Sequence, residues 1–220
     1  MKHIFQLCTI LIALAVSVSL PAASAGIQSN FDSGNDGWTI VDLANLGNDL
    51  GNPPQIISSL VPTWNPSGYI TQGDPSSNWC MFSAPAAYLG AKSQFVSGTL
   101  SFDMCVDQSD GISWPLVVLV GQDTTLYYDS MPPTSTWTHY SVDILPGAWR
   151  KHSRTGGLAT LSDIESVMGN LRGLYIEQDW NTGFETTSLD NVSLVPEPMA
   201  LFTLAFGVVG LAIRSRHYNR

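Results

Sequence analysis

Trp180 has the chemistry of a platform for a sugar ring, because it lies between a carboxylate, Asp179, and an amide, Asn181. The flat face of an indole packs well against apolar surface, and the neighbouring polar groups can bond the hydroxyls of a ring ligand. Trp114 is a second tryptophan beside a turn. The sequence therefore predicts a ligand-binding site at Trp180, Asp179, Asn181 and Trp114. The alternative is that these tryptophans pack at the rim of the core.

Catalytic machinery is harder to find. The chain has no G-x-S-x-G, H-E-x-x-H, phosphate-loop or dinucleotide motif. His139 and His152 have no obvious acid and nucleophile partner. We therefore predict that the protein is not an enzyme. A glycosidase that uses two carboxylates stays open as an alternative, although no pair stands out among the many acids.

Charge excludes one class of partner. Residues 26–196 contain 17 acidic side chains and five basic ones, Lys92, Arg150, Lys151, Arg154 and Arg172, for a net charge of −12. Such a surface repels nucleic acid and favours solubility. The same span holds two cysteines, Cys80 and Cys105. They either form a disulfide or act as two separate small hydrophobes, because spacing alone does not show whether their side chains meet.

The elements that must position these residues are mostly strands. Residues 99–106 and 138–144 alternate between apolar and polar, and residues 116–120 form a continuous apolar run typical of a buried strand. Further strands are expected at 38–42, 69–72, 125–129, 171–177 and 189–195. Trp38 and Trp137 are interpreted as strand residues and are expected in the core. This pattern predicts a single all-β domain, an antiparallel jelly-roll β-sandwich.

Two segments depart from the strand pattern. Ser162 and Glu165 have the spacing of a capping box before a helical apolar stripe, so we expect one short helix that ends at Gly169–Asn170. Residues 48–67 contain four prolines without a clear period. We expect a long loop there, with at most a short edge strand.

A family resemblance runs through the same region. Phe82-Ser83-Ala84-Pro85-Ala86-Ala87-Tyr88-Leu89-Gly90, the segment from Gly98 to Phe102, and the closing Leu189-Asp190-Asn191-Val192 with Leu194 resemble the laminin B (laminin IV type A) domain. The likeness covers nearly all of residues 31–195 in order. It implies a jelly-roll sandwich like those of carbohydrate-binding modules. Where the family often has an arginine after its L-x-I strand, this chain has Glu177-Gln178-Asp179.

The sandwich type also implies a metal site. The first and last strands of such sandwiches often lie together and hold a structural calcium ion. Asp32 lies near the expected start of the mature chain and Asp190 lies on the last strand. Carboxylate and backbone oxygens are the ligands that Ca²⁺ prefers, so we expect calcium at Asp32 and Asp190. The alternative is that both are acids of turns and strand surfaces.

Both ends of the chain carry targeting patterns. Lys2 precedes an apolar run to Leu20, and Ala23 and Ala25 form an A-x-A cleavage site, so residues 1–25 are predicted to be a signal peptide. At the other end, Val195-Pro196-Glu197-Pro198 precedes the apolar residues 199–213 and the basic residues Arg214, Arg216 and Arg220. Fifteen apolar residues span roughly 22 Å as a helix, a marginal length for a hydrocarbon core of about 30 Å.

This C-terminal arrangement closely resembles the PEP-CTERM sorting signal, which implies processing by an exosortase. A plain short membrane anchor is the alternative. The expected organisation is thus a signal peptide at 1–25, a β-sandwich domain at 26–194 and a sorting segment at 195–220. We expect an exported protein of the cell surface or extracellular matrix that is transiently anchored in the inner membrane. Its expected partner is exopolysaccharide, the alternative being a structural or adhesive role with protein partners.

Overall fold

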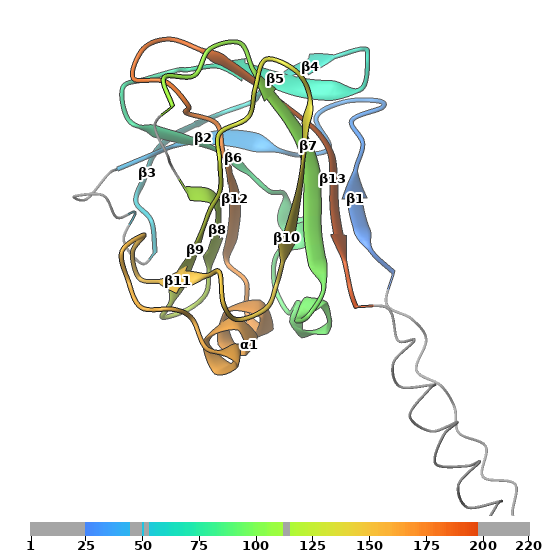
Figure 1. Ribbon diagram of the computed structural model, residues 1–220. Helices are drawn as coiled ribbons and strands as arrows, with labels where there is room; N and C mark the ends of the chain where they lie inside the picture. Colours follow the sequence, from blue (N-terminus) through green and yellow to red (C-terminus); the bar gives the residue numbers. More distant parts are fainter. Residues whose placement is uncertain (1–24, 45–49, 51–52, 112–114, 198–220) are drawn as a thin grey trace, which may run out of the picture.

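A computed structural model describes residues 25–44, 50, 53–111 and 115–197 of the chain (Figure 1). Thirteen strands, two 3-10 turns and one helix make up the described part. In chain order these are β1 Ile27–Ser29, β2 Thr39–Leu43, β3 Ile56–Leu60, β4 Thr63–Asn65, β5 Tyr69–Gly73, β6 Trp79–Ser83, η1 Ala86–Tyr88, η2 Ser93–Phe95, β7 Thr99–Val106, β8 Pro115–Val120, β9 Thr125–Asp129, β10 Thr138–Asp143, β11 Arg150–Lys151, α1 Leu161–Gly169, β12 Gly173–Glu177 and β13 Thr186–Val195.

The strands form two antiparallel sheets that pack face to face, so the predicted sandwich is confirmed (Figure 1). Sheet A has the order β10-β7-β13-β5-β4, and β1 also pairs with β13. Sheet B has the order β11-β9-β8-β12-β6-β2-β3. The fold is an antiparallel jelly-roll sandwich with one short helix at one end.

Alternation along the strands determines what each sheet buries. In β7 the side chains of Leu100, Phe102, Met104 and Val106 enter the core between the sheets, as expected from a period of two. Sheet B buries apolar residues on both faces. A second cluster on its other face contains Val41, Leu43, Leu50, Trp79, Met81, Val118, Val120, Tyr127 and Tyr175. This explains why β8 is continuously apolar, whereas β7 alternates.

The helix begins two residues earlier than the sequence pattern suggests. Thr160 is the N-cap: its hydroxyl oxygen accepts a hydrogen bond from the Asp163 backbone N–H, and the Asp163 carboxylate accepts one from the Thr160 backbone N–H. The predicted Ser162–Glu165 box is therefore wrong, because Thr160–Asp163 has the same spacing and takes the role. These hydrogen bonds to Thr160 hold the pKa of Asp163 below its usual value.

The long loop expected at residues 48–67 contains two edge strands. Within the described part of this stretch, β3 extends sheet B at its edge and β4 extends sheet A at its edge. Pro62 separates these strands and Pro66 follows β4. Both prolines lie outside the strands, where no ladder hydrogen bond needs the N–H that proline lacks.

The last strand ends where the sequence predicts. β13 runs to Val195 and stops before Pro196 and the exposed Glu197, since proline has no N–H for the ladder. Pro198, the apolar run and the basic Arg214 and Arg216 lie outside the described residues, as do residues 1–24 of the predicted signal peptide. Among the residues that the structure describes, no helix is long and apolar enough to cross a membrane.

Candidate functional site

The predicted platform at Trp180 is wrong, because the side chain of Trp180 is fully buried in the core between the sheets. Its backbone N–H donates to Oε1 of Glu185, 3.0 Å away. Asn181 is half-buried and accepts a hydrogen bond from Gly183 N–H, which holds a tight turn. Trp114 lies outside the described residues. Trp180, Asp179 and Asn181 thus build the connection from β12 to β13 and offer no exposed ring.

This connection lies at an acidic end of the sandwich. Thr182 donates to Asp110 through its backbone and its hydroxyl, both at 2.9 Å, and Thr186 N–H donates to Asp107 at 2.8 Å. Burial, and then repulsion from Asp74, raises the pKa of Asp179 to about 7. Burial also raises the pKa of Glu185 to about 8, with Asp179, Asp74 and Asp107 adding to the effect. Both carboxyl groups therefore lose their protons at a higher pH than an exposed carboxyl group does.

An exposed aromatic pair lies instead on the outer face of sheet A. Trp137, expected in the core, is 46% exposed. Its ring meets that of Tyr69 edge to face, with 5.5 Å between the ring centroids. The Tyr69 hydroxyl accepts a hydrogen bond from the side-chain amide of Asn65 at 2.7 Å. By contrast Trp38, also expected in the core, is indeed buried there.

Strand register explains how these two rings meet. Thr138 is opposite Met104, Met104 is opposite Leu189, and Leu189 is opposite Ile70. Met104, Leu189 and Ile70 all point into the core. Trp137, just before β10, and Tyr69, the first residue of β5, are each one residue away from this row and therefore point outward. Their strands are three spacings apart, roughly 14 Å. The rings therefore lean toward each other across β7 and β13.

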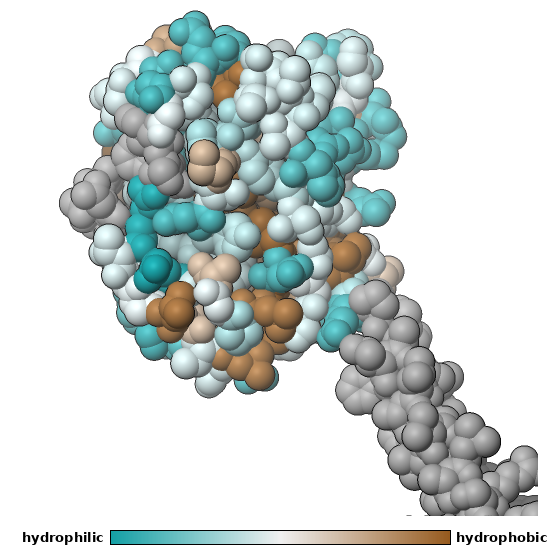
Figure 2. All heavy atoms as spheres, viewed as in Figure 1, coloured by the Kyte–Doolittle hydropathy of each residue, from teal (hydrophilic) through white to brown (hydrophobic). Residues whose placement is uncertain are grey.

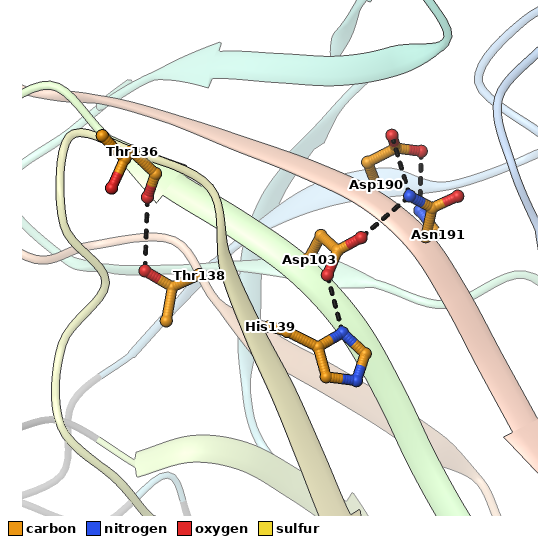
Figure 3. A network of polar contacts seen from close by, with 6 residues as sticks. All are labelled: Asp103, Thr136, Thr138, His139, Asp190 and Asn191. Carbon is orange, nitrogen blue, oxygen red and sulfur yellow. Dashed lines mark hydrogen bonds and ion pairs between the residues drawn. The ribbon is translucent and has the colours of Figure 1, made fainter.

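A polar network continues the same face (Figure 3). His139 Nδ1 lies 2.7 Å from Oδ1 of Asp103, and the side-chain amide of Asn191 donates to Oδ2 of Asp103 at 2.8 Å. The same amide donates to Asp190 at 3.2 Å, and the Asn191 backbone N–H donates to the other Asp190 oxygen at 2.6 Å. These side chains come from β7, β10 and β13. They present several hydrogen-bonding groups beside the Tyr69 ring.

A bulge in β13 makes this network possible. The register with β7 shifts between Asp190 and Ser193, and Asn191 takes a φ of 52°. An extra residue at a bulge breaks the strict alternation of sides, so Asp190 and Asn191 both turn outward, while Leu189 and Val192 remain buried. Asparagine tolerates this left-handed conformation better than most residues do. A third aromatic ring, Phe184, is 68% exposed and rests on Gly73 at the end of β5.

The predicted calcium ligands lie near each other. β1 pairs with the end of β13, and a hollow of about 140 Å³ opens between them, lined by Gln28, Ser29, Asn30, Asn191, Val192 and Ser193. Burial, and then the charges of Asp103 and Asp32, raises the pKa of Asp190. The Asn30 side chain donates to Asp32. Within the described ranges no three His, Cys, Asp or Glu side chains group as metal ligands, so calcium at Asp32 and Asp190 stays a prediction.

The structure distinguishes between a disulfide and two separate thiols at Cys80 and Cys105. Cys80 and Cys105 are both free thiols. Cys80 points from sheet B into the core, where burial raises its pKa well above the usual value. Cys105 alternates with the core residues Met104 and Val106 and therefore points out of sheet A. Side chains on opposite sides of sheet A cannot form a disulfide, so the alternative of two separate cysteines is the one that the structure shows.

Comparison with known proteins identifies the family. A model of the Laminin B (Domain IV) family matches residues 81–196, and the chain belongs to this family. The L4b domain of human laminin alpha-2 is similar in structure, with a TM-score of 0.63, 12% identity, and coverage of 79% of this chain and 98% of that one. At this identity the likeness describes the shared sandwich fold.

Two further similar structures have lower scores. The family 11 carbohydrate-binding module of the cellulosomal cellulase Lic26A-Cel5E of Clostridium thermocellum aligns with a TM-score of 0.38 and 13% identity, over 81% of this chain and 91% of that one. An exo-beta-agarase aligns with a TM-score of 0.46 and 10% identity, over 77% of this chain and 25% of that one. Comparison with curated proteins found no match.

The site residues that sequence reasoning missed had weak signals. Tyr69 and Trp137 are far apart in the chain. The polar residues before Trp137 resembled the start of a half-buried strand, so Trp137 was expected in the core. Asp103 and His139 occupy the polar positions of two strands that the sequence did predict correctly. Pairing these strands in register would have brought the two residues together. The bulge at Asn191 has no comparable signal beyond the dipeptide Asp190-Asn191.

Proposed function

We propose that the domain is a non-catalytic carbohydrate-binding module of an exported surface or matrix protein. The observation that carries this proposal is the outer face of sheet A, where the exposed Trp137–Tyr69 pair adjoins the Asp103–His139–Asn191 network. Aromatic rings with a few convergent polar groups are the usual components of a site for a polar ring ligand.

The charge on the outer face of sheet A limits the class of glycan that can bind there. Asp103 and Asp190 contribute carboxylates, and the domain around them has a large excess of acids. A glycan rich in uronate or sulfate would meet like charge, whereas a neutral glycan would stack on Trp137 and donate hydroxyl hydrogen bonds to the carboxylates. We therefore propose a neutral exopolysaccharide as ligand. Shallow sites of this kind bind weakly, with dissociation constants on the order of mM to µM.

The proposed function also includes export of the chain and its sorting at the C-terminal segment. The sequence at residues 1–25 directs export, and an exosortase recognises Pro196-Glu197-Pro198 with the apolar segment behind it. This assignment accords with a domain of the Laminin B family, which we place at the cell surface or in the extracellular matrix. The rival function is a structural matrix component with protein partners and no sugar binding.

A glycan array with the full-length chain separates the two functions. Saturable binding to neutral glycans, lost in Trp137→Ala and kept in Ile57→Ala, would support the carbohydrate-binding function. Ile57 is a suitable control because it is 53% exposed on β3, at the far edge of the other sheet. Absence of binding to every neutral glycan, including the host's own exopolysaccharide, would leave the structural function. New reducing ends on incubation with these glycans would instead show an enzyme.

A further inference from the structure

Both chain ends leave the sandwich at the same end, which we call the α1 pole. β1 starts at Ile27 beside Leu194, and Gly26 lies against Val195. The pole contains α1 because Lys92 N–H, next to η2, donates to Met168 O at 2.7 Å, while Gly98, just after η2, lies against the Val195 carbonyl. Figure 1 shows α1 and the end of β13 at the same end of the molecule.

The apolar C-terminal segment must begin close to this pole. Only Pro196, Glu197 and Pro198 separate the end of β13 at Val195 from Met199, the first residue of the apolar run. Three extended residues reach roughly 10 Å. A segment that inserts into a bilayer from Met199 onward therefore holds the α1 pole near the lipid surface, whatever the orientation of the rest of the domain.

The α1 pole also exposes apolar side chains. Leu161 in the first turn of α1 is 44% exposed and Leu158 just before it is 54% exposed. Leu145 after β10 and Val195 at the end of β13 are 39% and 37% exposed. In Figure 2 the hydrophobic colour gathers toward the end that carries α1, while hydrophilic residues dominate the opposite end. Such side chains suit the boundary between lipid headgroups and acyl chains.

Charged side chains of both signs lie at the α1 pole, whereas acidic side chains gather at the opposite end. Lys92 and Arg172 flank α1, and Lys151 pairs with Asp163 in its first turn at 3.2 Å. The opposite end, where β12 connects to β13, gathers Asp74, Asp107, Asp110, Asp179 and Glu185. Acidic side chains, among them Glu165 in α1 and Asp143 beside Leu145, lie at the α1 pole as well, so its apolar side chains, and not its charge, favour contact with lipid.

We propose that the α1 pole rests on the lipid bilayer in which the C-terminal apolar segment is anchored, with Leu145, Leu158, Leu161 and Val195 in contact with the interface. The occupant is the lipid surface itself. The opposite, acidic end then points away from the membrane. The outer face of sheet A lies roughly perpendicular to the membrane surface and stays open to glycan. The inference rests on the proposed function, in which the apolar segment behind Pro196-Glu197-Pro198 holds the chain transiently in the membrane during sorting.

Hydrogen exchange of the full-length chain in phosphatidylcholine vesicles tests this orientation. In the wild-type chain, the backbone amides of residues 143–149 and 157–163 should exchange several-fold more slowly than the same amides in the double variant Leu158→Glu, Leu161→Glu. The matched control is Met131→Glu, Phe184→Glu, which changes two side chains that are 78% and 68% exposed outside the α1 pole. This control should leave the protection of the α1 pole unchanged.

Each other outcome overturns the inference in a distinguishable way. A chain that does not float with the vesicles contradicts the anchoring itself, and with it the reason for the pole to meet lipid. If the wild type and the double variant both float with the vesicles and their amides exchange equally fast, the orientation alone is contradicted. A double variant that dissociates an oligomer without changing lipid-dependent protection shows that the α1 pole is a protein interface. Glycan binding is unaffected in all these cases.

Discussion

Trp137 and Tyr69 meet with 5.5 Å between their ring centroids, although β7 and β13 lie between their strands in sheet A. Neither ring is buried in the core, so the contact is an interaction on the surface of the sheet. Because edge-to-face pairing restrains both rings, the pair offers a preformed surface to a ligand.

Trp137→Ala should weaken the binding of a neutral glycan by about tenfold, since loss of a stacking ring removes on the order of 1 kcal/mol. Trp137→Phe should recover part of the affinity because a smaller ring remains. Titration followed by isothermal calorimetry measures both. Equal affinity in all three proteins would place the ligand elsewhere on the molecule.

Substitutions at Asn191 should separate the backbone role of this residue from its side-chain role. Asn191→Gly keeps the left-handed conformation of φ 52° and loses the amide that bridges Asp103 and Asp190. Asn191→Ala loses the amide and also strains the backbone, at a cost of about 1–3 kcal/mol. We expect urea unfolding to show the alanine variant less stable than the glycine variant, while both lose glycan affinity. Equal stability would contradict the bulge at this position.

Stability should fall as the pH rises between about 4 and 8. Asp179 and Glu185 have folded pKa values of about 7 and about 8, above their ordinary values of 3.8 and 4.5. In this window the folded state binds more protons than the unfolded state, so their contribution is complete below the ordinary values and is lost as the pH passes the folded ones. Thermal unfolding at pH 5 and pH 8 measures the trend.

Glu185→Gln is the matched variant for the pH dependence. It removes one buried carboxyl group while the remaining side-chain oxygen can still accept the hydrogen bond from Trp180 N–H. The melting temperature of this variant should decline less between pH 5 and pH 8 than that of wild type. An identical decline in both proteins would show that Glu185 is not a source of the dependence.

The two free cysteines should react differently with a thiol reagent under native conditions. Cys105 is partly exposed on the outer face of sheet A, whereas Cys80 is buried. Mass spectrometry of the described domain should find Cys105 modified first and Cys80 only after unfolding. Recovery of a Cys80–Cys105 disulfide peptide would contradict the strand orientations.

Calcium at Asp32 and Asp190 remains open to a direct measurement. If the ion binds there, excess Ca²⁺ should raise the melting temperature of wild type, and EDTA should reverse the gain. Asp190→Asn should abolish the response, while Asp123→Asn, a change outside the pair, should keep it. A wild-type protein that melts at the same temperature in Ca²⁺ and in EDTA would rule out a structural ion.

Local sequence patterns determined the strands and the sandwich. The alternation in residues 99–106 places Leu100, Phe102, Met104 and Val106 in the core, because a strand turns successive side chains to opposite faces. The same logic ends β13 at Val195 before a proline, and the order of the motifs identified the laminin B resemblance. These features depend on neighbours in the chain, so the sequence carries them.

Tertiary structure alone decided which tryptophans are exposed. Trp180 beside two polar residues is buried, and Trp137 at the start of a strand is half exposed, because exposure depends on which face of which sheet a side chain meets. Pairing between strands distant in the chain brought Trp137 to Tyr69, and His139 to Asp103. It also turned Cys80 inward and Cys105 outward. These are non-local relations, set by register and by the bulge at Asn191, and no local pattern encodes them.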